Sequence, residues 1–140
     1  MTILSKVPPH SDEAEKSVLG SILIEKDAII RIADLLRPDD FYSEIHKLIY
    51  EGMLELFDKR RPIDILTLGE HLKDNKDLDV VGGSTYLAEL TTVVSTTAHL
   101  VEHGLIIKNK STLRKLISSG TFIASLGYTE DKEIDLLLEN

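Results

Sequence analysis

One stretch near the carboxyl end limits what this chain can fold into. Between about residue 97 and about residue 126 there is no proline, and glycine occurs only at Gly104 and Gly120. Proline is the strongest breaker of helices, so its absence permits one uninterrupted helix over this range. Such a helix spans roughly 45 Å, which is longer than a small globular head requires. We therefore expect a compact head over residues 1–95 and a projecting helical segment over residues 96–140.

A second, shorter helix is expected to fold back along the first. Gly127-Tyr128-Thr129 interrupts the long pattern, and the Thr129 side chain is well placed to cap a helix that begins at Glu130. The apolar positions of this return arm are Ile134, Leu137 and Leu138. Its pattern stops unfinished at Asn140. We therefore predict a helical hairpin over 96–140 with a truncated second arm, in a chain that is a piece of a longer protein.

The head is predicted to be a bundle of short helices. Pro8-Pro9 sets an extended lead-in, and Ser11 follows as an N-cap with acidic residues in the first turn. Apolar residues then recur at a spacing of four, at Ala14, Val18 and Ile22. Further helices are expected after Ser43, after Asp64, after the cap Ser84 of a glycine loop, and from Ile29 to Leu36. No segment keeps a period of two, so the predicted fold class is all-α: a compact helical bundle head followed by a helical hairpin.

Composition excludes several classes of protein. The chain carries 16 basic and 24 acidic side chains, a net charge of −8, which repels a phosphate backbone unless the cations cluster. The densest basic run, Lys59-Arg60-Arg61, is interpreted as a solvated loop, with DNA contact as the less favoured alternative. The absence of cysteine rules out disulfides and thiolate metal sites, and no apolar run approaches the length of a membrane span.

The long helix carries an apolar face that needs a partner. From Leu113 onward, apolar and small residues cover roughly half of the helix circumference at 100° per residue. They are Leu113, Leu116, Ile117, Gly120, Ile123, Ala124 and Gly127. One return arm is too narrow to cover such a face, so we expect it to pack against another chain. Packing back onto the head is the alternative.

Four blocks of sequence, taken in order along the chain, carry a resemblance to a known family. They are Pro8-Pro9-His10-Ser11 leading into Glu13 to Gly20; Asp40-Phe41-Tyr42 with His46 and Ile49; Pro62-Ile63-Asp64 with Thr67 and Leu72; and Val81-Gly82-Gly83 with Tyr86, Leu87 and Leu90. Together they resemble the amino-terminal domain of the bacterial replicative DNA helicase, the DnaB family. The long helix departs from the family's pattern at His99 and at His103-Gly104.

The resemblance implies a role in assembly. In this family the domains pair through their hairpins into a collar of three dimers above six motor domains, and the collar docks the carboxyl-terminal domain of primase. The motor domains hydrolyse ATP with Mg²⁺, unwind DNA and make most contacts with single-stranded DNA. A helicase loader is a further partner, and the expected location is the bacterial cytoplasm at the nucleoid. The predicted dimer interface is Leu113, Ile117, Gly120 and Ala124, and the candidates for primase docking are Tyr86, Leu116 and Ile123.

No residue of this chain is assigned to catalysis or to binding a cofactor or metal. The phosphate-binding loop of a motor is missing, because no glycine is followed four residues later by Gly-Lys-Ser/Thr. His99 and His103 spell H-x-x-E-H, an inverted zinc-protease pattern, but no third ligand is evident and both are interpreted as surface histidines. His46 is interpreted as a partly buried structural histidine, and Glu13 with Glu15 as a charge pair at a helix start.

Two other classes of function stay open. One is a stand-alone helical adaptor that binds helicase or primase without a motor domain. The other is a metal-dependent enzyme built on the two histidines. Tyr86 is likewise interpreted in two ways, as a core residue or as a partner contact at the rim of the head.

Overall fold

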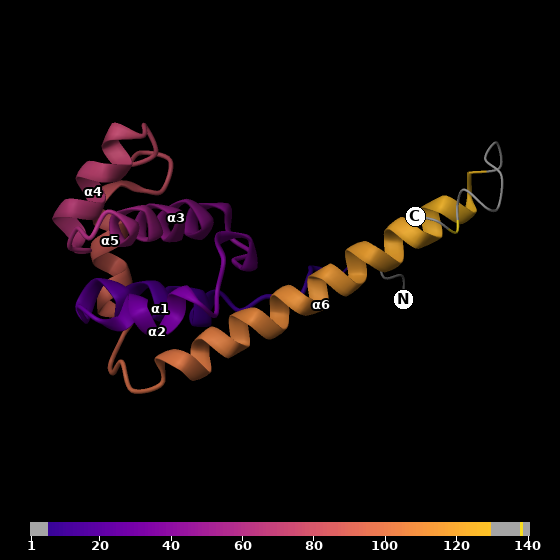
Figure 1. The fold of residues 1–140 in the computed structure, drawn as a ribbon, viewed down its shortest axis with the longest axis horizontal. Coiled ribbons are helices and arrows are strands. Elements are labelled where there is room, and N and C mark those ends of the chain that lie inside the picture. The colour runs from indigo at the N-terminus through magenta and orange to yellow at the C-terminus, as the bar shows by residue number, and fades with distance from the viewer. Residues whose placement is uncertain (1–5, 130–137, 139–140) are drawn as a thin grey trace.

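Helices alone make up the secondary structure of the part of the chain that the computed structural model describes, residues 6–129 and 138. They form a head from which one long helix projects (Figure 1). The elements are α1 (Asp12–Ile24), α2 (Ala28–Ala33), the 3-10 turn η2 (Pro38–Asp40), α3 (Glu44–Asp58), α4 (Ile65–Asp74), α5 (Gly83–Thr92) and α6 (Leu100–Gly127). The predicted all-α fold class is confirmed. The predicted return arm from residue 130 onward lies, apart from Leu138, outside the described residues.

Three predicted helix starts are confirmed by their caps. The Ser11 hydroxyl accepts a hydrogen bond from the Ala14 backbone N–H at 3.2 Å. Ser43 caps α3 in the same way. Asp64 and Thr67 form a reciprocal capping box at the start of α4, in which each side chain accepts from the other's backbone N–H. These bonds satisfy N–H groups that have no partner inside the helix, which is why short local signals fix the helix starts.

The glycine loop before α5 differs from its prediction. The N-cap is Gly82, so Ser84 lies inside the first turn and does not cap the helix. Gly82 and Gly83 both adopt positive φ, 103° and 72°, in a region that a residue without a Cβ occupies at little cost. Backbone freedom, rather than a serine side chain, therefore sets the start of α5.

Two helix bounds also differ from prediction. α2 ends at Ala33 and not at Leu36. A turn over residues 34–35 follows it, and Pro38 disfavours helical backbone at Arg37, which is extended. α6 begins at Leu100 and not near residue 97. The boundary predicted at residue 95 falls in the connector between α5 and α6 and stays a prediction.

The helix α1 lies at the centre of the head, in contact with α2, α3, α5 and α6. Its predicted apolar stripe is buried, and Val18 and Leu19 have no exposed surface. The closest approach is at Gly20, where an added Cβ would lie 2.1 Å from the carbonyl oxygen of Leu90. Real Cβ atoms do not approach an oxygen so closely, so α1 and α5 pack at this distance only because residue 20 is glycine.

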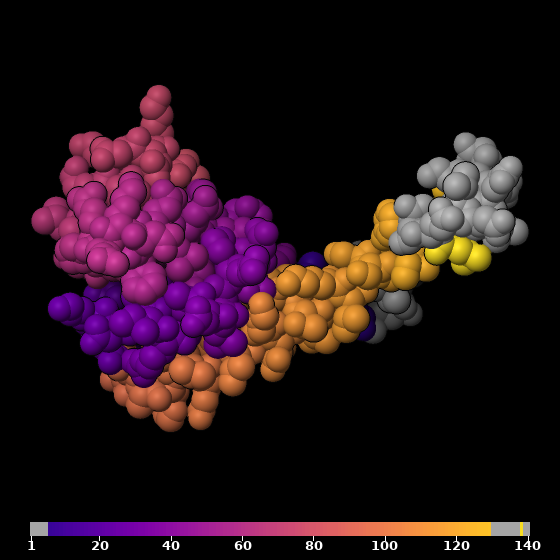
Figure 2. All heavy atoms as spheres, in the orientation of Figure 1, coloured from indigo at the N-terminus to yellow at the C-terminus, as the bar shows by residue number. Residues whose placement is uncertain are grey.

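The long helix α6 lies against the head along its first half only. Its 28 residues correspond to about 42 Å of helix. Leu100, Gly104, Ile107 and Ser111 are buried against the head, whereas none of residues 112–129 is buried. Figure 2 shows the second half as an arm that projects away from the head. Within the described residues, the alternative that its apolar face packs back onto the head is wrong.

Candidate interaction surface and its supporting joint

The exposed half of α6 presents the predicted apolar face to solvent. Leu113 and Ile117 are 44% and 43% exposed, and an added Cβ on Gly120 would meet open space. At 100° per residue, these three residues and Ala124 lie within a narrow stripe along the helix. We call these four residues the arm stripe. It is the surface on the described residues best suited to pack against another helix, since its small residues permit close approach.

The arm stripe points away from the side of α6 that contacts the head. The buried residues Gly104 and Ser111 lie on the opposite side of the helix at 100° per residue. Ile106, which is 40% exposed, has the same angular position as Ala124 and extends the stripe toward the head. Leu116 and Ile123 are 64% and 66% exposed and border it on one side. The assignments to a dimer interface and to primase docking stay predictions.

The sequence pattern missed Phe122. It is 52% exposed and continues the head-facing side of α6 beyond the end of the head. The sequence does not show which side of α6 faces the head, and only the packing of α6 reveals it.

A buried carboxylate fixes α6 to the head where the arm departs. Asp40, 1% exposed, accepts hydrogen bonds from the Ser111 hydroxyl at 2.7 Å, from the Lys108 ammonium at 3.1 Å and from the Arg37 backbone N–H at 2.8 Å. Lys115 lies farther away, at 3.7 Å. Burial alone would raise the pKa of Asp40, but the hydrogen bonds from Arg37, Ser111 and Lys108 outweigh it and lower the pKa below its usual 3.8. Asp40 is therefore ionised near neutral pH and holds α6 in one position.

An arginine and the chain's lead-in segment complete this joint. The Arg114 guanidinium donates to the carbonyl oxygens of Pro9, at 2.8 Å, and Asp40, at 2.7 Å. It also lies 5.6 Å from the centre of the Tyr42 ring, which stacks on His10 at 4.2 Å. A planar guanidinium can satisfy two carbonyl groups and a ring face together. The segment before α1 thus clamps α6 from one side while η2 holds it from the other.

A second buried network corrects the interpretation of Glu15. Glu15 is 2% exposed, and its carboxylate accepts from the backbone N–H groups of Tyr42 and Ser43 and pairs with His46 Nδ1 at 2.7 Å. Of the two glutamates, only Glu13 is exposed at the helix start, beside the exposed Asp12. The error arose because the partners of Glu15 come from the loop before α3 and from the first turn of α3, 27 to 31 residues away. His46 is buried, as predicted for a structural histidine.

The same network reaches Tyr86. His46 Nε2 lies 2.7 Å from the Tyr86 hydroxyl, so the imidazole ring links the Glu15 carboxylate to the tyrosine. Burial raises the pKa of Tyr86 above its ordinary value. The Tyr86 hydroxyl therefore forms its hydrogen bond within the head, and only the half-buried ring of Tyr86 remains available to a partner.

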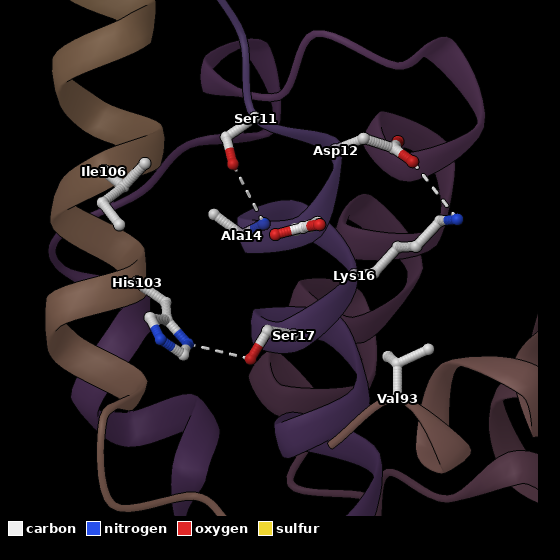
Figure 3. A pocket seen from close by; sticks show the side chains of 9 residues that line it. Ser11, Asp12, Ala14, Lys16, Ser17, Val93, His103 and Ile106 are labelled. Carbon is white, nitrogen blue, oxygen red and sulfur yellow. Dashed lines mark hydrogen bonds and ion pairs between the residues drawn. The ribbon is translucent and has the colours of Figure 1, made fainter. Parts of the chain in front are cut away.

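A hollow of roughly 490 Å³ lies between the start of α1, Val93 and α6 (Figure 3). Inside it the His103 ring contacts the Ser17 hydroxyl through Nδ1 at 2.8 Å, and Lys16 pairs with Asp12 at 3.2 Å. His103 is therefore a half-buried tether between α6 and α1, which corrects its interpretation as a surface histidine.

The H-x-x-E-H pattern does not converge on a site in the described part of the chain. His99 is exposed, its ring centre lies 6.2 Å from that of His103, and it pairs with Glu102 at 3.5 Å. Among residues 6–129 and 138, no three His, Cys, Asp or Glu side chains are grouped to hold a metal ion. Across the same residues, no helix combines the length and apolarity needed to cross a membrane.

Comparisons with known sequences converge on one family. The family described as DnaB-like helicase N terminal domain matches residues 7–109. The chain is 39% identical over 134 residues to the replicative DNA helicase DnaB of Geobacillus stearothermophilus, covering 96% of this chain and 30% of that protein. It is 39% identical over 133 residues to the replicative DNA helicase DnaC of Bacillus subtilis, covering 95% and 29%. The chain thus spans about 30% of the length of these curated relatives.

Comparisons with solved structures agree. The chain superposes on the N-terminal domain of DnaB helicase from Mycobacterium tuberculosis with a TM-score of 0.91 and 34% identity, covering 95% of this chain and 94% of that one. It superposes with a TM-score of 0.74 and 28% identity on a DnaB-like replicative helicase solved for its interactions with primase, covering 92% of this chain and 31% of that one.

Proposed function

The chain belongs to the DnaB-like helicase N terminal domain family, as its four sequence blocks indicated, and we propose that it forms the collar of a replicative DNA helicase. The observation that carries the proposal is the arm stripe: an exposed apolar surface on a helix that the joint at Asp40 fixes away from the head. A surface of that kind serves association with another chain better than it serves a monomer.

Self-association is the first part of the proposed role. Arm stripes of two copies pack against each other, with Gly120 and Ala124 allowing close approach and Leu113 and Ile117 supplying apolar area. Three such dimers complete a hexameric collar. Because the two stripes are the same surface, each contact is self-complementary, as a two-fold axis requires.

Docking of primase is the second part. One solved neighbour is a DnaB-like replicative helicase whose structure was determined with its interactions with primase in view. The candidates here are the ring of Tyr86 together with Leu116 and Ile123, which border the arm stripe and are 64% and 66% exposed in the single chain. The net charge of −8 favours a basic partner surface and a rate of association that falls with added salt.

The chemistry of the whole helicase belongs, in this proposal, to a motor domain outside this chain. That domain binds ATP and Mg²⁺, translocates on single-stranded DNA and meets a helicase loader, in the bacterial cytoplasm. The relatives named replicative DNA helicase are longer proteins, and this chain spans about 30% of their length.

Sedimentation of substituted chains tests the role of the arm stripe. Ile117→Asp places a charge in the middle of the stripe and is expected to weaken self-association by tenfold or more. Ser119→Asp is the matched control, since it adds the same charge to the same exposed turns but outside the stripe. Equal association constants for the two variants would mean that the chains associate through another surface.

A further inference from the structure

A groove on the head, separate from the arm, combines apolar and basic side chains. It has a volume of roughly 600 Å³, and its lining residues come from two segments, 23–30 and 57–64. Its apolar residues include Phe57 and Ile63, and two others are unusually exposed for isoleucine: Ile24 at 51% and Ile30 at 58%. No residue of α6 lines it. The proposed collar contacts therefore leave this groove unexplained.

The cations of this groove are unpaired within the described residues. Lys26, Arg60 and Arg61 line it, and none forms an ion pair with another described residue. Two carboxylates, Asp27 and Asp64, lie in the same lining. Asp64 already accepts the Thr67 backbone N–H at 2.8 Å as the cap of α4. The groove thus keeps a positive edge in a chain whose net charge is −8.

The backbone holds the two arginines at the edge of the groove. Arg60 N–H donates to the Phe57 carbonyl at 3.0 Å and Arg61 N–H to the Leu56 carbonyl at 2.9 Å, which closes the carboxyl end of α3 as a Schellman motif. Arg60 has φ 57°, a left-handed conformation that usually falls to glycine. An arginine therefore occupies a position where glycine would close the same turn with less strain.

We propose that this groove binds an acidic amphipathic helical segment of a partner protein. Its apolar side covers the exposed isoleucines, Ile24 and Ile30, and its carboxylates meet Lys26, Arg60 and Arg61. The three cations favour an acidic partner. The apolar residues that line the groove favour a protein over a nucleic acid. A phosphate backbone has no apolar face to cover the exposed isoleucines, whereas an amphipathic helix has one.

Fluorescence anisotropy with a defined probe tests the proposal on the full 140-residue chain. The probe is a labelled synthetic helical peptide with leucine at every third and fourth position and glutamate on its other faces. We expect saturable binding that weakens as salt is added. A peptide with lysine in place of glutamate, and a single-stranded oligonucleotide of similar length, are compared under the same conditions.

Matched variants locate the binding. Arg60→Gly and Ile30→Ser are each expected to weaken binding of the acidic peptide by about fivefold or more. Lys76→Gly is the control for Arg60, because Lys76 has φ 64° and closes the end of α4 with the same two types of hydrogen bond. Leu66→Ser is the control for Ile30, because Leu66 is 74% exposed and does not line the groove. Circular dichroism establishes that all four variants are folded.

Loss of binding in Arg60→Gly and Ile30→Ser, with both controls unchanged, supports the groove. Absence of saturable binding, or equal losses in variants and controls, overturns the proposal. Tighter binding of the oligonucleotide, lost in Arg60→Gly, overturns it in favour of nucleic acid. None of these four positions belongs to the arm stripe, so the result does not depend on whether the collar assembles as proposed.

Discussion

Replacing Asp40 with asparagine tests whether the joint at the base of the arm is electrostatic. One carboxylate oxygen accepts from Ser111 and the other from both Arg37 N–H and Lys108. An asparagine can keep its oxygen on Arg37 N–H and Lys108 and turn its NH₂ group to the Ser111 hydroxyl, which can also accept, so the substitution mainly removes the negative charge from a site that is 1% exposed. We expect a loss of about 1–2 kcal/mol in the free energy of unfolding near neutral pH, because the bonds from Arg37 N–H and Ser111 lose a charged acceptor. The contribution of Lys108 is discounted because its side chain is 36% exposed.

The dependence of this loss on pH follows from the direction of the pKa shift. The pKa of Asp40 is lower in the folded chain than its ordinary value of 3.8. The stabilisation is therefore fully present above that ordinary value and disappears as the pH falls through the folded pKa. The difference between wild type and Asp40→Asn is accordingly expected to shrink toward about pH 3.

Urea unfolding, followed by circular dichroism from neutral to acid pH, measures both effects. Asp39→Asn is the control, since it makes the same chemical change at the exposed neighbouring position in η2. A loss for Asp40→Asn below about 0.5 kcal/mol, the size expected of a surface ion pair, would refute the reasoning. So would a loss that is the same at acid and at neutral pH.

Three further outcomes are expected. Gly20→Ala should lower the melting temperature by about 3 °C or more, because its Cβ would lie 2.1 Å from the Leu90 carbonyl oxygen and overpacking typically costs about 1–3 kcal/mol. A smaller change in calorimetry would contradict the packing of α1 on α5. Ile49→Ala should lower the free energy of unfolding by about 2–5 kcal/mol because Ile49 is fully buried. Leu48→Ala should lower it clearly less, because Leu48 is only half-buried. Equal losses for the two variants would mean that the core is misplaced. The purified chain should not hydrolyse ATP in a coupled phosphate-release assay. Turnover above a contamination control would overturn the proposal that ATP hydrolysis belongs to a motor domain outside this chain.

The sequence predicted correctly the features that depend on only a few neighbouring residues. The caps at Ser11, Ser43 and Asp64 are of this kind, because a cap bonds to an N–H two or three residues ahead. The arm stripe was likewise predictable from helical periodicity alone. At Ser84 the same reasoning failed, since a serine and two glycines were competing signals and backbone freedom at Gly82 decided the outcome.

Features that join distant segments were not predictable in this way. Asp40 and Ser111 are 71 residues apart, and Glu15 and His46 are 31 apart. No local pattern marks either pair, because a buried carboxylate finds its donors only once the helices have packed. The groove lined by residues 23–30 and 57–64 is hidden from the sequence for the same reason.

The joint at Asp40 also makes α6 a lever. From Ser111 to Gly127 the free part of the helix measures ~24 Å, so a tilt of about 10° at the joint displaces its tip by ~4 Å. That displacement is lateral to the helix axis, and it is a large fraction of the 8–10 Å that typically separates the axes of packed helices. In the proposed collar, the few hydrogen bonds around one carboxylate would therefore set the distance between subunits at the far end of the arm. A change in protonation or packing at the joint would reach neighbouring subunits as a change of geometry, with no residue of the proposed contact surface altered.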